Sequence, residues 1–324
     1  MSNTVQVDHN ELPTESDQAE TRHHSAADPD FAQIAWVRCI PFILLHLACG
    51  LVFVVGWSPI ALITASLMYI FHMFVITAFY HRYFSHRAFK TTRVFQFLGA
   101  FAATSSAQRG PLWWAAHHRH HHLHSDDEHD THSPSRRGLL MSHIGWFMTK
   151  GAFRTPDRLV RDWVRYPELR FINRFDWLSP VLLAFLLFGI GAILESYAPA
   201  LGTNAWQMFV WGFVVSTVAV YHATYTINSL SHRYGSARFE TGDDSRNNIW
   251  LALLTMGEGW HNNHHFYPAA ARQGFKWWEI DMTYYGLVLL SKLGLIWDLR
   301  GVPQRIMEQA KPIDRRGIDG QVDE

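Results

Sequence analysis

The chain has 324 residues, of which 48% are hydrophobic, and it carries 21 histidines but only two cysteines. Basic and acidic side chains number 28 each, so the net charge of zero argues against nucleic acid as a partner. Cys39 and Cys49 both lie in or beside one apolar stretch, which argues against a disulfide framework and against a zinc knuckle.

Four apolar stretches alternate with segments crowded with charged residues and histidine. Residues 1–30 are polar and are predicted to form a disordered tail. The apolar stretches lie at about 40–57, 60–80, 177–198 and 205–230, and a short break containing proline separates the members of each pair. Each is close to the roughly 20 residues that cross a bilayer as a helix. We therefore predict an all-α integral membrane protein with four transmembrane helices in two hairpins.

The basic residues predict the orientation of these spans. None of the 28 lies inside either pair of stretches or the break between its members. If each pair is a hairpin, both termini and the central loop share one face, which the positive-inside rule assigns to the cytoplasm, most simply of a bacterial inner membrane. Two shorter apolar segments, 94–107 and 282–297, are expected to be helices at the interface. The predicted domain covers 31–300, with a cytoplasmic helical cap at 81–176 and 231–300 and a charged tail at 301–324.

Histidines cluster in four motifs placed beside the predicted spans. His81-Arg-Tyr-Phe-Ser-His86 lies where the second span ends, and Asn228-Ser-Leu-Ser-His232 lies where the fourth ends. Segment 113–122 (WWAAHHRHHH) is in the central loop, and 257–265 (GEGWHNNHH) is in the C-terminal region. The predicted orientation places all four motifs on the cytoplasmic face.

The spacing within the motifs suits metal binding. Residues three or four apart share one face of a helix, so His118 aligns with His121 or His122. His261 aligns in the same way with His264 or His265. Imidazole binds borderline transition metals such as iron and zinc. The motifs offer nine candidate ligands, which is more than one ion can hold, so we predict a pair of ions.

Together, these motifs resemble those of the membrane-bound fatty acid desaturases, in particular the acyl-CoA Δ9 (stearoyl-CoA type) branch. His-x4-His, two His-x-x-His-His motifs and Asn-x3-His all occur, and the resemblance covers about 36–298. The matching residues outside the histidine motifs are Gln108, Trp114, Ser135-Arg136-Arg137-Gly138, Ser142-His143-x-Gly145-Trp146 and Arg246-x-Asn248.

The resemblance implies a site with two iron ions (Fe2+) and O2 as co-substrate. Such an enzyme removes two hydrogens from an unactivated methylene pair of an acyl chain, leaves a cis double bond, and takes two electrons from outside. No His-Pro-Gly-Gly module occurs in the sequence, so we expect an external ferredoxin, rubredoxin or cytochrome b5 with its reductase. The ligands implied are His81, His86, His118, His121, His122, His232, His261, His264 and His265, with Asn228 holding a metal-bound water.

The expected substrate is a saturated long-chain acyl-CoA, with an acyl-lipid substrate or a related hydroxylase as the alternative. Arg119, Arg136 and Arg137 are candidates for the CoA phosphates, although a basic face beside anionic lipid explains them nearly as well. The acyl chain is expected to run between the second and fourth spans, where Tyr69 would close the tunnel unless it simply packs against a neighbouring helix. The remaining expected contacts are Gln108, Trp114, Trp146, Thr224, Tyr225 and Met73.

Other interpretations of the histidines stay open at this level. A shift of one residue in the second motif would offer His117, His120 and His121 as the His-x-x-His-His set. A carboxylate-bridged di-iron bundle needs a second Glu-x-x-His motif beside Glu258-Gly-Trp-His261, and we find none. A metal transporter should carry ionisable groups at mid-membrane. The spans offer only His46, His72 and His222, which are expected to be core or tunnel residues, while His129 and His132 are expected to be solvated or to lie behind the ligands.

Overall fold

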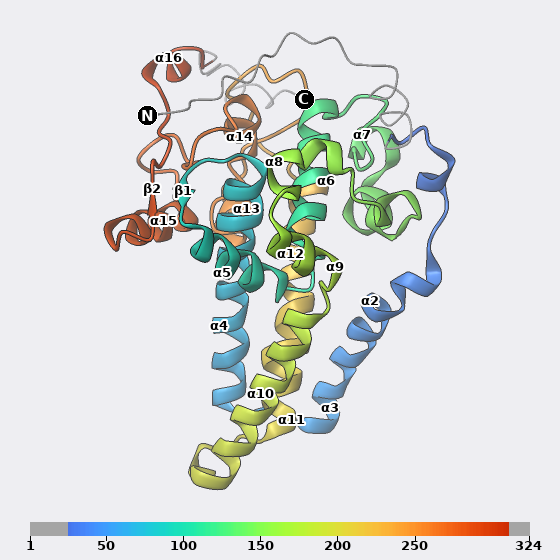
Figure 1. The fold of residues 1–324 in the computed structure, drawn as a ribbon, viewed down its shortest axis with the longest axis vertical. Coiled ribbons are helices and arrows are strands. Elements are labelled where there is room, and N and C mark those ends of the chain that lie inside the picture. The colour runs from blue at the N-terminus through green and yellow to red at the C-terminus, as the bar shows by residue number, and fades with distance from the viewer. Residues whose placement is uncertain (1–24, 311–324) are drawn as a thin grey trace, which may run out of the picture.

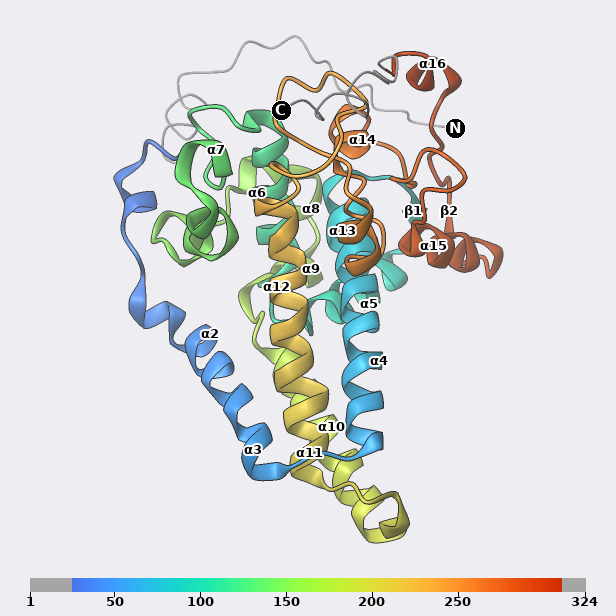
Figure 2. The same cartoon turned by 180° about the vertical axis from the view of Figure 1, so that it is seen from behind.

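The structure is a computed structural model that describes residues 25–310. Long helices stand together at one end of the molecule, and the shorter helices gather at the other end, here called the head (Figures 1 and 2). Four helical segments are long and apolar enough to cross a membrane: Trp36–Val55, Pro59–Ser85, Leu178–Tyr197 and Ala205–Ser229. The four predicted segments are therefore confirmed as helices long and apolar enough to cross a membrane, whereas their pairing as hairpins and their orientation stay predictions.

The first two spans are joined by a turn at Gly56, whose φ of 67° suits glycine. The first consists of α2 (Trp36–Ala48), η2 (Cys49–Leu51) and α3 (Val52–Val55). Ser58 then caps α4 (Pro59–Val75), because its Oγ accepts a hydrogen bond from the Ala61 N–H at 3.2 Å. The second span is longer than predicted, since α4 continues without a break into the π-helix η3 (Ile76–Ser85).

The second pair of spans follows the same plan. The first helix, α10 (Leu178–Tyr197), is followed by η8 (Pro199–Leu201). The fourth span consists of α11 (Ala205–Phe209), the π-helix η9 (Val210–Val215) and α12 (Ser216–Ser229). A Cβ atom at Gly191 would lie 2.6 Å from Cα of Ala205, so the absence of a side chain there lets α10 and α11 touch.

The head contains the remaining elements. The predicted interfacial segments 94–107 and 282–297 contain the helices α5 (Arg93–Thr104) and α15 (Met282–Lys292). Strand β1 (Lys90–Thr91) pairs antiparallel with β2 (Ile296–Trp297) and joins the start of the central loop to the C-terminal region. The other elements are η1 (Pro29–Ala32), α6 (Pro111–His124), α7 (Pro134–Arg137), η4 (Met141–Gly145), η5 (Trp146–Met148), η6 (Gly151–Phe153), η7 (Asp157–Val160), α8 (Arg161–Val164), α9 (Pro167–Arg174), α13 (Ile249–Leu254), α14 (His261–Phe266) and α16 (Gln304–Met307).

The largest buried cluster surrounds the head end of the second span. Phe79, Tyr80 and Phe84 of η3 pack there with residues of α5 and α6, and Gly99 lies directly against the Phe79 ring. By contrast, only 6% of the apolar window of the first span is buried inside the protein. Apolar surface left exposed along a whole helix is expected where lipid is the solvent. The buried cluster around Phe79, Tyr80 and Phe84 provides a rigid support for the histidines in the head.

The last part of the predicted N-terminal tail is folded. Residues 1–24 and 311–324 lie outside the described residues, but 25–30 are folded against the head. Ser25 Oγ lies 2.8 Å from His129 Nδ1, and Arg154 forms ion pairs with Asp28 and Asp30 at 3.0 and 2.8 Å. His129 is therefore bonded to this segment rather than free in solvent. Partners in the central loop therefore hold residues 25–30 against the head.

Candidate metal centre

The nine histidines named from the motifs come together in the head as two groups. The first group has five members and the second has four, and within each group one ring nitrogen of every member lies within 4.8 Å of the others. The first group is His81, His86, His118, His122 and His264; the second is His121, His232, His261 and His265.

The π-helix explains how His81 and His86 share one group. Five residues on an α-helix would turn the second side chain about 140° away from the first. In η3 the backbone N–H of His86 instead donates to the carbonyl of His81 at 3.3 Å, the five-residue hydrogen bond of a π-helix. The two ring centroids are consequently 4.9 Å apart. The His-x4-His spacing therefore depends on a local winding that α-helical periodicity does not predict.

Each His-x-x-His-His motif is divided between the two groups. On α6, His118 and His122 are one turn apart and face the first group, with Nε2 atoms 3.0 Å apart. The adjacent His121 points to the second group. On α14 the division is reversed, since His261 and His265 face the second group and His264 faces the first. The two helices therefore bridge both groups and hold them side by side.

The ring nitrogens are arranged as a cation requires. His81 Nε2 lies 2.9 Å from His264 Nε2, and His232 Nε2 lies 3.0 Å from His261 Nε2. His81 and His232 each direct Nδ1 at a carboxylate, so Nδ1 carries the proton and Nε2 carries a lone pair. Such nitrogens repel neighbouring acceptors unless a positive ion lies between them. The donor set of imidazoles, with no thiolate, suits iron or zinc.

Carboxylates hold four of the nine rings from behind. His232 Nδ1 lies 2.7 Å from Asp126, His121 Nδ1 lies 3.1 Å from Asp130, and His265 Nδ1 lies 2.6 Å from Asp243. The fourth is Glu258, which contacts His81 Nδ1. These partners fix the tautomer and ring orientation of metal ligands. Asp126, Asp130 and Asp243 lie outside the histidine motifs, and their only signal in the sequence is the acidic run 126–130 and the pair 243–244.

Glu258 also connects the site to the buried end of the second span. Arg82 is only 1% exposed and forms ion pairs with Glu258 at 3.0 Å and with Asp281 at 2.9 Å. Gln273 Nε2 donates to Glu258 at 3.0 Å. Glu258 therefore holds the His81 ring and compensates the charge of Arg82. These contacts account for a glutamate three residues before His261 without a carboxylate-bridged metal site.

Burial keeps most of the rings neutral. It lowers the pKa of His265 from 6.5 to about 4. Burial alone would raise the pKa of Asp126, but its hydrogen bond to His232 lowers that pKa to about 2. The Asp126 carboxylate is thus charged, and a ring with a lowered pKa is in the neutral form that binds metal. His121 is the exception, because Asp130 raises its pKa against the effect of burial. Burial also lowers the pKa well below 6.5 in His86, His118, His122, His261 and His264.

The structure distinguishes the two possible alignments of the second motif. His117 Nδ1 bonds to the Trp113 carbonyl at 2.9 Å, and neither His117 nor His120 belongs to either group. His132 is buried and shares Asp130 with His121, so it lies behind a ligand as expected. Asn228 lies at the end of α12 and lines a cavity. Its side-chain amide has no hydrogen-bond partner among residues 25–310.

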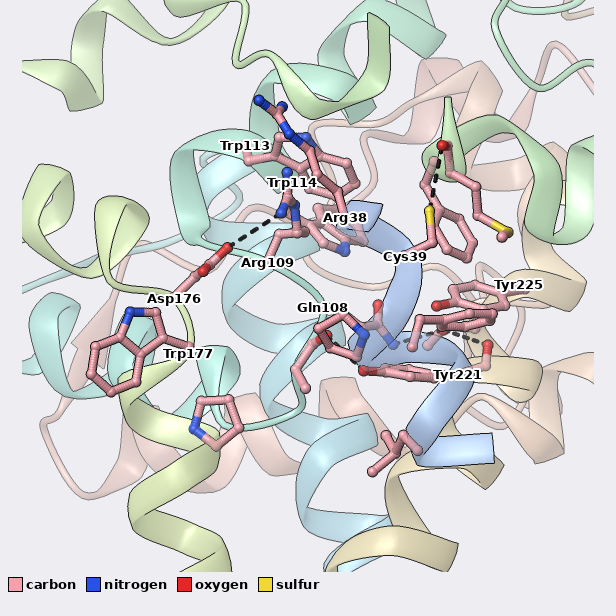
Figure 3. Close-up of a pocket in the computed structure, with 18 of the residues that line it drawn as sticks. Arg38, Cys39, Gln108, Arg109, Trp113, Trp114, Asp176, Trp177, Tyr221 and Tyr225 are labelled. Carbon is pink, nitrogen blue, oxygen red and sulfur yellow. Dashed lines mark hydrogen bonds and ion pairs between the residues drawn. The ribbon is translucent and has the colours of Figure 1, made fainter. Parts of the chain in front are cut away.

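A largely apolar cavity of about 810 Å³ leads to the histidines (Figure 3). Its size is typical of a small-molecule site. His118 of the first group and Asn228 form part of its wall, and the rest comes mainly from α2, α6, α10, α12 and η5. Gln108 donates to Thr224 Oγ1 at 2.9 Å across it. Of the expected substrate contacts, Gln108, Trp114, Trp146, Thr224 and Tyr225 line this cavity.

The other expected substrate contacts lie elsewhere. Tyr69 does not line this cavity; its hydroxyl donates to the Leu254 carbonyl at 2.8 Å, and its ring borders a small separate hollow between α4 and α12. Met73 is fully buried in the core. The expected path between the second and fourth spans is therefore corrected, because α4 and α12 pack together while α2 and α10 leave room.

The arginines expected at the CoA phosphates already have partners. Arg119 forms two hydrogen bonds to Asp162, at 2.8 and 3.0 Å, and donates to the carbonyls of Phe84, Ser85 and Leu159. Arg136 donates to the Asp126 carbonyl at 3.1 Å, and Arg137 donates to the Phe31 carbonyl at 2.8 Å. These side chains therefore hold the loops around the histidines together.

The histidines within the spans are not part of the two groups. His72 is buried with Nε2 3.2 Å from Ser105 Oγ. His46 Nε2 lies 3.2 Å from His222 Nε2, and His222 Nδ1 lies 3.1 Å from His143 Nε2. This row links α2, α12 and η4. His72 is therefore a core residue, whereas His46 is partly buried and His222 is exposed on the protein surface. The described spans carry no mid-membrane metal group of the kind a transporter needs.

Four helices long and apolar enough to cross a membrane thus stand beside two groups of histidines, each of which could hold a metal ion. Residues 56–287 match the family model "Fatty acid desaturase". The chain belongs to this family. It is 33% identical over 276 residues to an sn-1 stearoyl-lipid 9-desaturase of Anabaena variabilis, covering 83% of this chain and 94% of the relative.

Two further relatives differ in the molecule that carries the acyl chain. An sn-1 stearoyl-lipid 9-desaturase of Synechocystis is 36% identical over 277 residues, covering 84% of this chain and 82% of the relative. An acyl-CoA 5-desaturase of Anemone leveillei is 35% identical over 266 residues, covering 81% and 78%. The family is thus shown, and these relatives indicate an oxidoreductase that acts on acyl chains. The specific acyl-CoA Δ9 branch is not distinguished from the acyl-lipid enzymes by these relatives.

Proposed function

We propose that the protein is a di-iron desaturase that uses O2 and two electrons to introduce a cis double bond at carbon 9 of a saturated long acyl chain. One observation carries this proposal: a largely apolar cavity is lined both by residues of the membrane-spanning helices and by His118 and Asn228. His118 is a member of the five-histidine group. An acyl chain lying there would present its methylenes beside the metal site. The position is supported by the two stearoyl-lipid relatives, whose names specify carbon 9.

The residues of the cavity would bind and orient the chain. Phe42, Phe188 and Phe213 provide apolar wall, and each methylene transferred into such surroundings contributes about 0.8 kcal/mol. Tyr221 donates to the Ala107 carbonyl at 2.8 Å and thereby ties the loop before α6 to α12. With Gln108 and Thr224, this contact keeps the wall opposite α2 rigid, so one methylene pair stays in place.

The nine histidines would hold two Fe2+ ions, five rings in the first group and four in the second, and Asn228 would hold a metal-bound water. Bound iron supplies the oxidising power that removal of hydrogen from an unactivated methylene requires. The protein would limit the access of water, because five of the nine rings are buried and the other four are partly buried, and Asp130 and Glu258 behind them are buried as well. Asp126, Asp130, Asp243 and Glu258 each hold a proton on Nδ1 of the imidazole in front.

The electrons would come from a separate ferredoxin, rubredoxin or cytochrome b5 system. We place the head on the cytoplasmic side of a bacterial inner membrane, where such donors are found, because all 28 lysines and arginines lie outside the paired spans. A hydroxylase built on the same irons would insert oxygen at the same position, and the product therefore decides between the two reactions.

The test is expression in a desaturase-deficient host, followed by mapping of double bonds in its lipids by mass spectrometry. We expect a new monounsaturated acyl chain with the bond at carbon 9, and we expect the His264→Ala variant to yield none. Purified protein should contain two irons per chain. A hydroxylated chain as the main product, or an unchanged lipid profile with iron bound, would contradict the proposal.

A further inference from the structure

Two arginines meet at one edge of the cavity. Arg38 of α2 and Arg109 of the α5–α6 loop both line it, and their guanidinium groups lie 5.3 and 4.4 Å from the centroid of the Phe153 ring. Figure 3 shows both side chains beside Trp113 and Trp114. Arg109 has a φ of 68°, a left-handed conformation that is costly for arginine and is typical of functional positions. Its backbone is therefore held where it places this side chain at the cavity.

The positive charge of this pair is only partly compensated. Arg109 lies 3.9 Å from Asp176, which is beyond hydrogen-bond range, and Arg38 forms no ion pair with any residue in 25–310. Burial lowers the pKa of Arg109, and Arg38 nearby lowers it further, against the effect of Asp176. Two guanidinium groups therefore face one carboxylate at the edge of an apolar cavity. An anion bound between them would relieve this imbalance.

The arginine pair lies at the depth of lipid head groups. Trp36 begins α2 and Trp177 precedes α10, and their side chains are 65% and 57% exposed. Exposed tryptophans at the ends of spans mark the interface between membrane and water. Arg38 and Asp176 are within two residues of them in sequence. The charged edge of the cavity is thus at the membrane surface.

From this edge the cavity faces the bilayer between α2 and α10. Pro41 on α2 and Val181 and Phe185 on α10 line it, and the Phe185 side chain is 72% exposed. In both views α2 leans away from the other spans (Figures 1 and 2). A chain can therefore slide in sideways from the lipid while its head group stays at the surface.

We propose that the substrate is a glycerophospholipid, whose phosphodiester binds Arg38 and Arg109 while its saturated acyl chain lies in the cavity. This inference rests on the proposed desaturase function. In such a lipid the phosphate is a few bonds from the acyl ester, so both fit at one edge of the cavity. In acyl-CoA the whole pantetheine arm separates the phosphates from the thioester, and a galactolipid has no anion. Guanidinium groups bind phosphate oxygens through paired hydrogen bonds.

The experiment compares three carriers of the same chain. Full-length, iron-loaded protein in maltoside micelles is given 1-stearoyl-2-oleoyl-phosphatidylglycerol, the galactolipid with the same acyl chains, or stearoyl-CoA. We expect the lowest KM for the phospholipid. Arg38→Gln should raise that KM about tenfold, as loss of a charge-assisted hydrogen bond predicts, with kcat and the galactolipid KM unchanged. Arg38→Lys should have an intermediate KM. The matched control is Arg170→Gln, which removes an exposed charge from α9.

The outcomes separate this inference from the proposed function. Equal KM values for phospholipid and galactolipid, a preference for stearoyl-CoA, or an equal loss with all three carriers in Arg38→Gln would overturn the phosphate site and leave the desaturase intact. No product from any carrier would contradict the desaturase itself. In that case native mass spectrometry still decides the head-group site. Wild-type protein should retain phosphatidylglycerol over galactolipid, and Arg38→Gln should retain both equally.

Discussion

The carboxylate of Glu258 contacts Nδ1 of His81. The same carboxylate accepts a hydrogen bond from Arg82, which lies 176 residues away in sequence. Removing the negative charge should loosen the first histidine group. We expect Glu258→Gln to lower iron affinity about 10- to 100-fold, as loss of a carboxylate behind a ligand does elsewhere. Iron content after dialysis against a graded chelator series measures this. Glu128→Gln is the control, because Glu128 is exposed in the same region. Equal iron retention in both variants would show that Glu258 only neutralises Arg82.

The second histidine motif can be tested one residue at a time. His118→Ala removes a member of the first group and should abolish activity with loss of iron. His117→Ala removes a ring that bonds to the Trp113 carbonyl outside both groups, so iron content should stay at two per chain. Metal analysis of the purified variants is the measurement. Iron loss in His117→Ala with iron retained in His118→Ala would reverse the assignment.

Iron binding should be lost in a defined acidic range. A histidine whose pKa is lowered by folding contributes stability that is present above the ordinary value of 6.5 and is lost as the pH falls through the lowered value, about 4 for His265. We therefore expect both the iron content and the unfolding midpoint of the protein to fall between about pH 6.5 and pH 4. Measurements at intervals of half a pH unit would show this. A midpoint that rises on acidification would contradict the buried neutral state of these rings.

Chain-length preference should depend on α10 rather than on α4. Phe188 packs edge-on against Trp206, with centroids 5.1 Å apart, at the part of the cavity farthest from the head. Phe188→Ala should lengthen the cavity and shift the preferred chain upward by one or two methylenes, each contributing about 0.8 kcal/mol of burial. The product profile across acyl chains that differ by two carbons measures the shift.

Tyr69→Ala serves as the contrasting variant. Its hydroxyl joins α4 to the Leu254 carbonyl and its ring does not border the cavity. We expect a loss of at least about 1 kcal/mol in unfolding free energy, from the hydrogen bond alone, and no change in preferred chain length. An upward shift in chain length with Tyr69→Ala, and none with Phe188→Ala, would restore the path between the second and fourth spans.

The sequence by itself determined the spans, the family and the identity of the clustered histidines. These features depend on local properties: an apolar run of sufficient length, the absence of basic residues within it, and imidazoles at fixed short spacings. Each can be read from neighbouring residues alone. Local spacing did not predict that His81 and His86 belong to one group. Side chains five residues apart share a face only in a π-helix, and the π-helix forms where α4 enters the buried core of the head.

Only the tertiary structure decided how the histidines are shared between the two groups and where the apolar cavity lies. Adjacent rings such as His121 and His122 point about 100° apart on a helix, so which group each joins depends on where α14 lies against α6. The carboxylates at Asp126 and Asp243 reach His232 and His265 across long stretches of chain. The cavity lies beside α2 and α10, not between the second and fourth spans as expected. Side-chain packing between spans sets the spacing of helices in a bilayer, and hydropathy does not predict that packing.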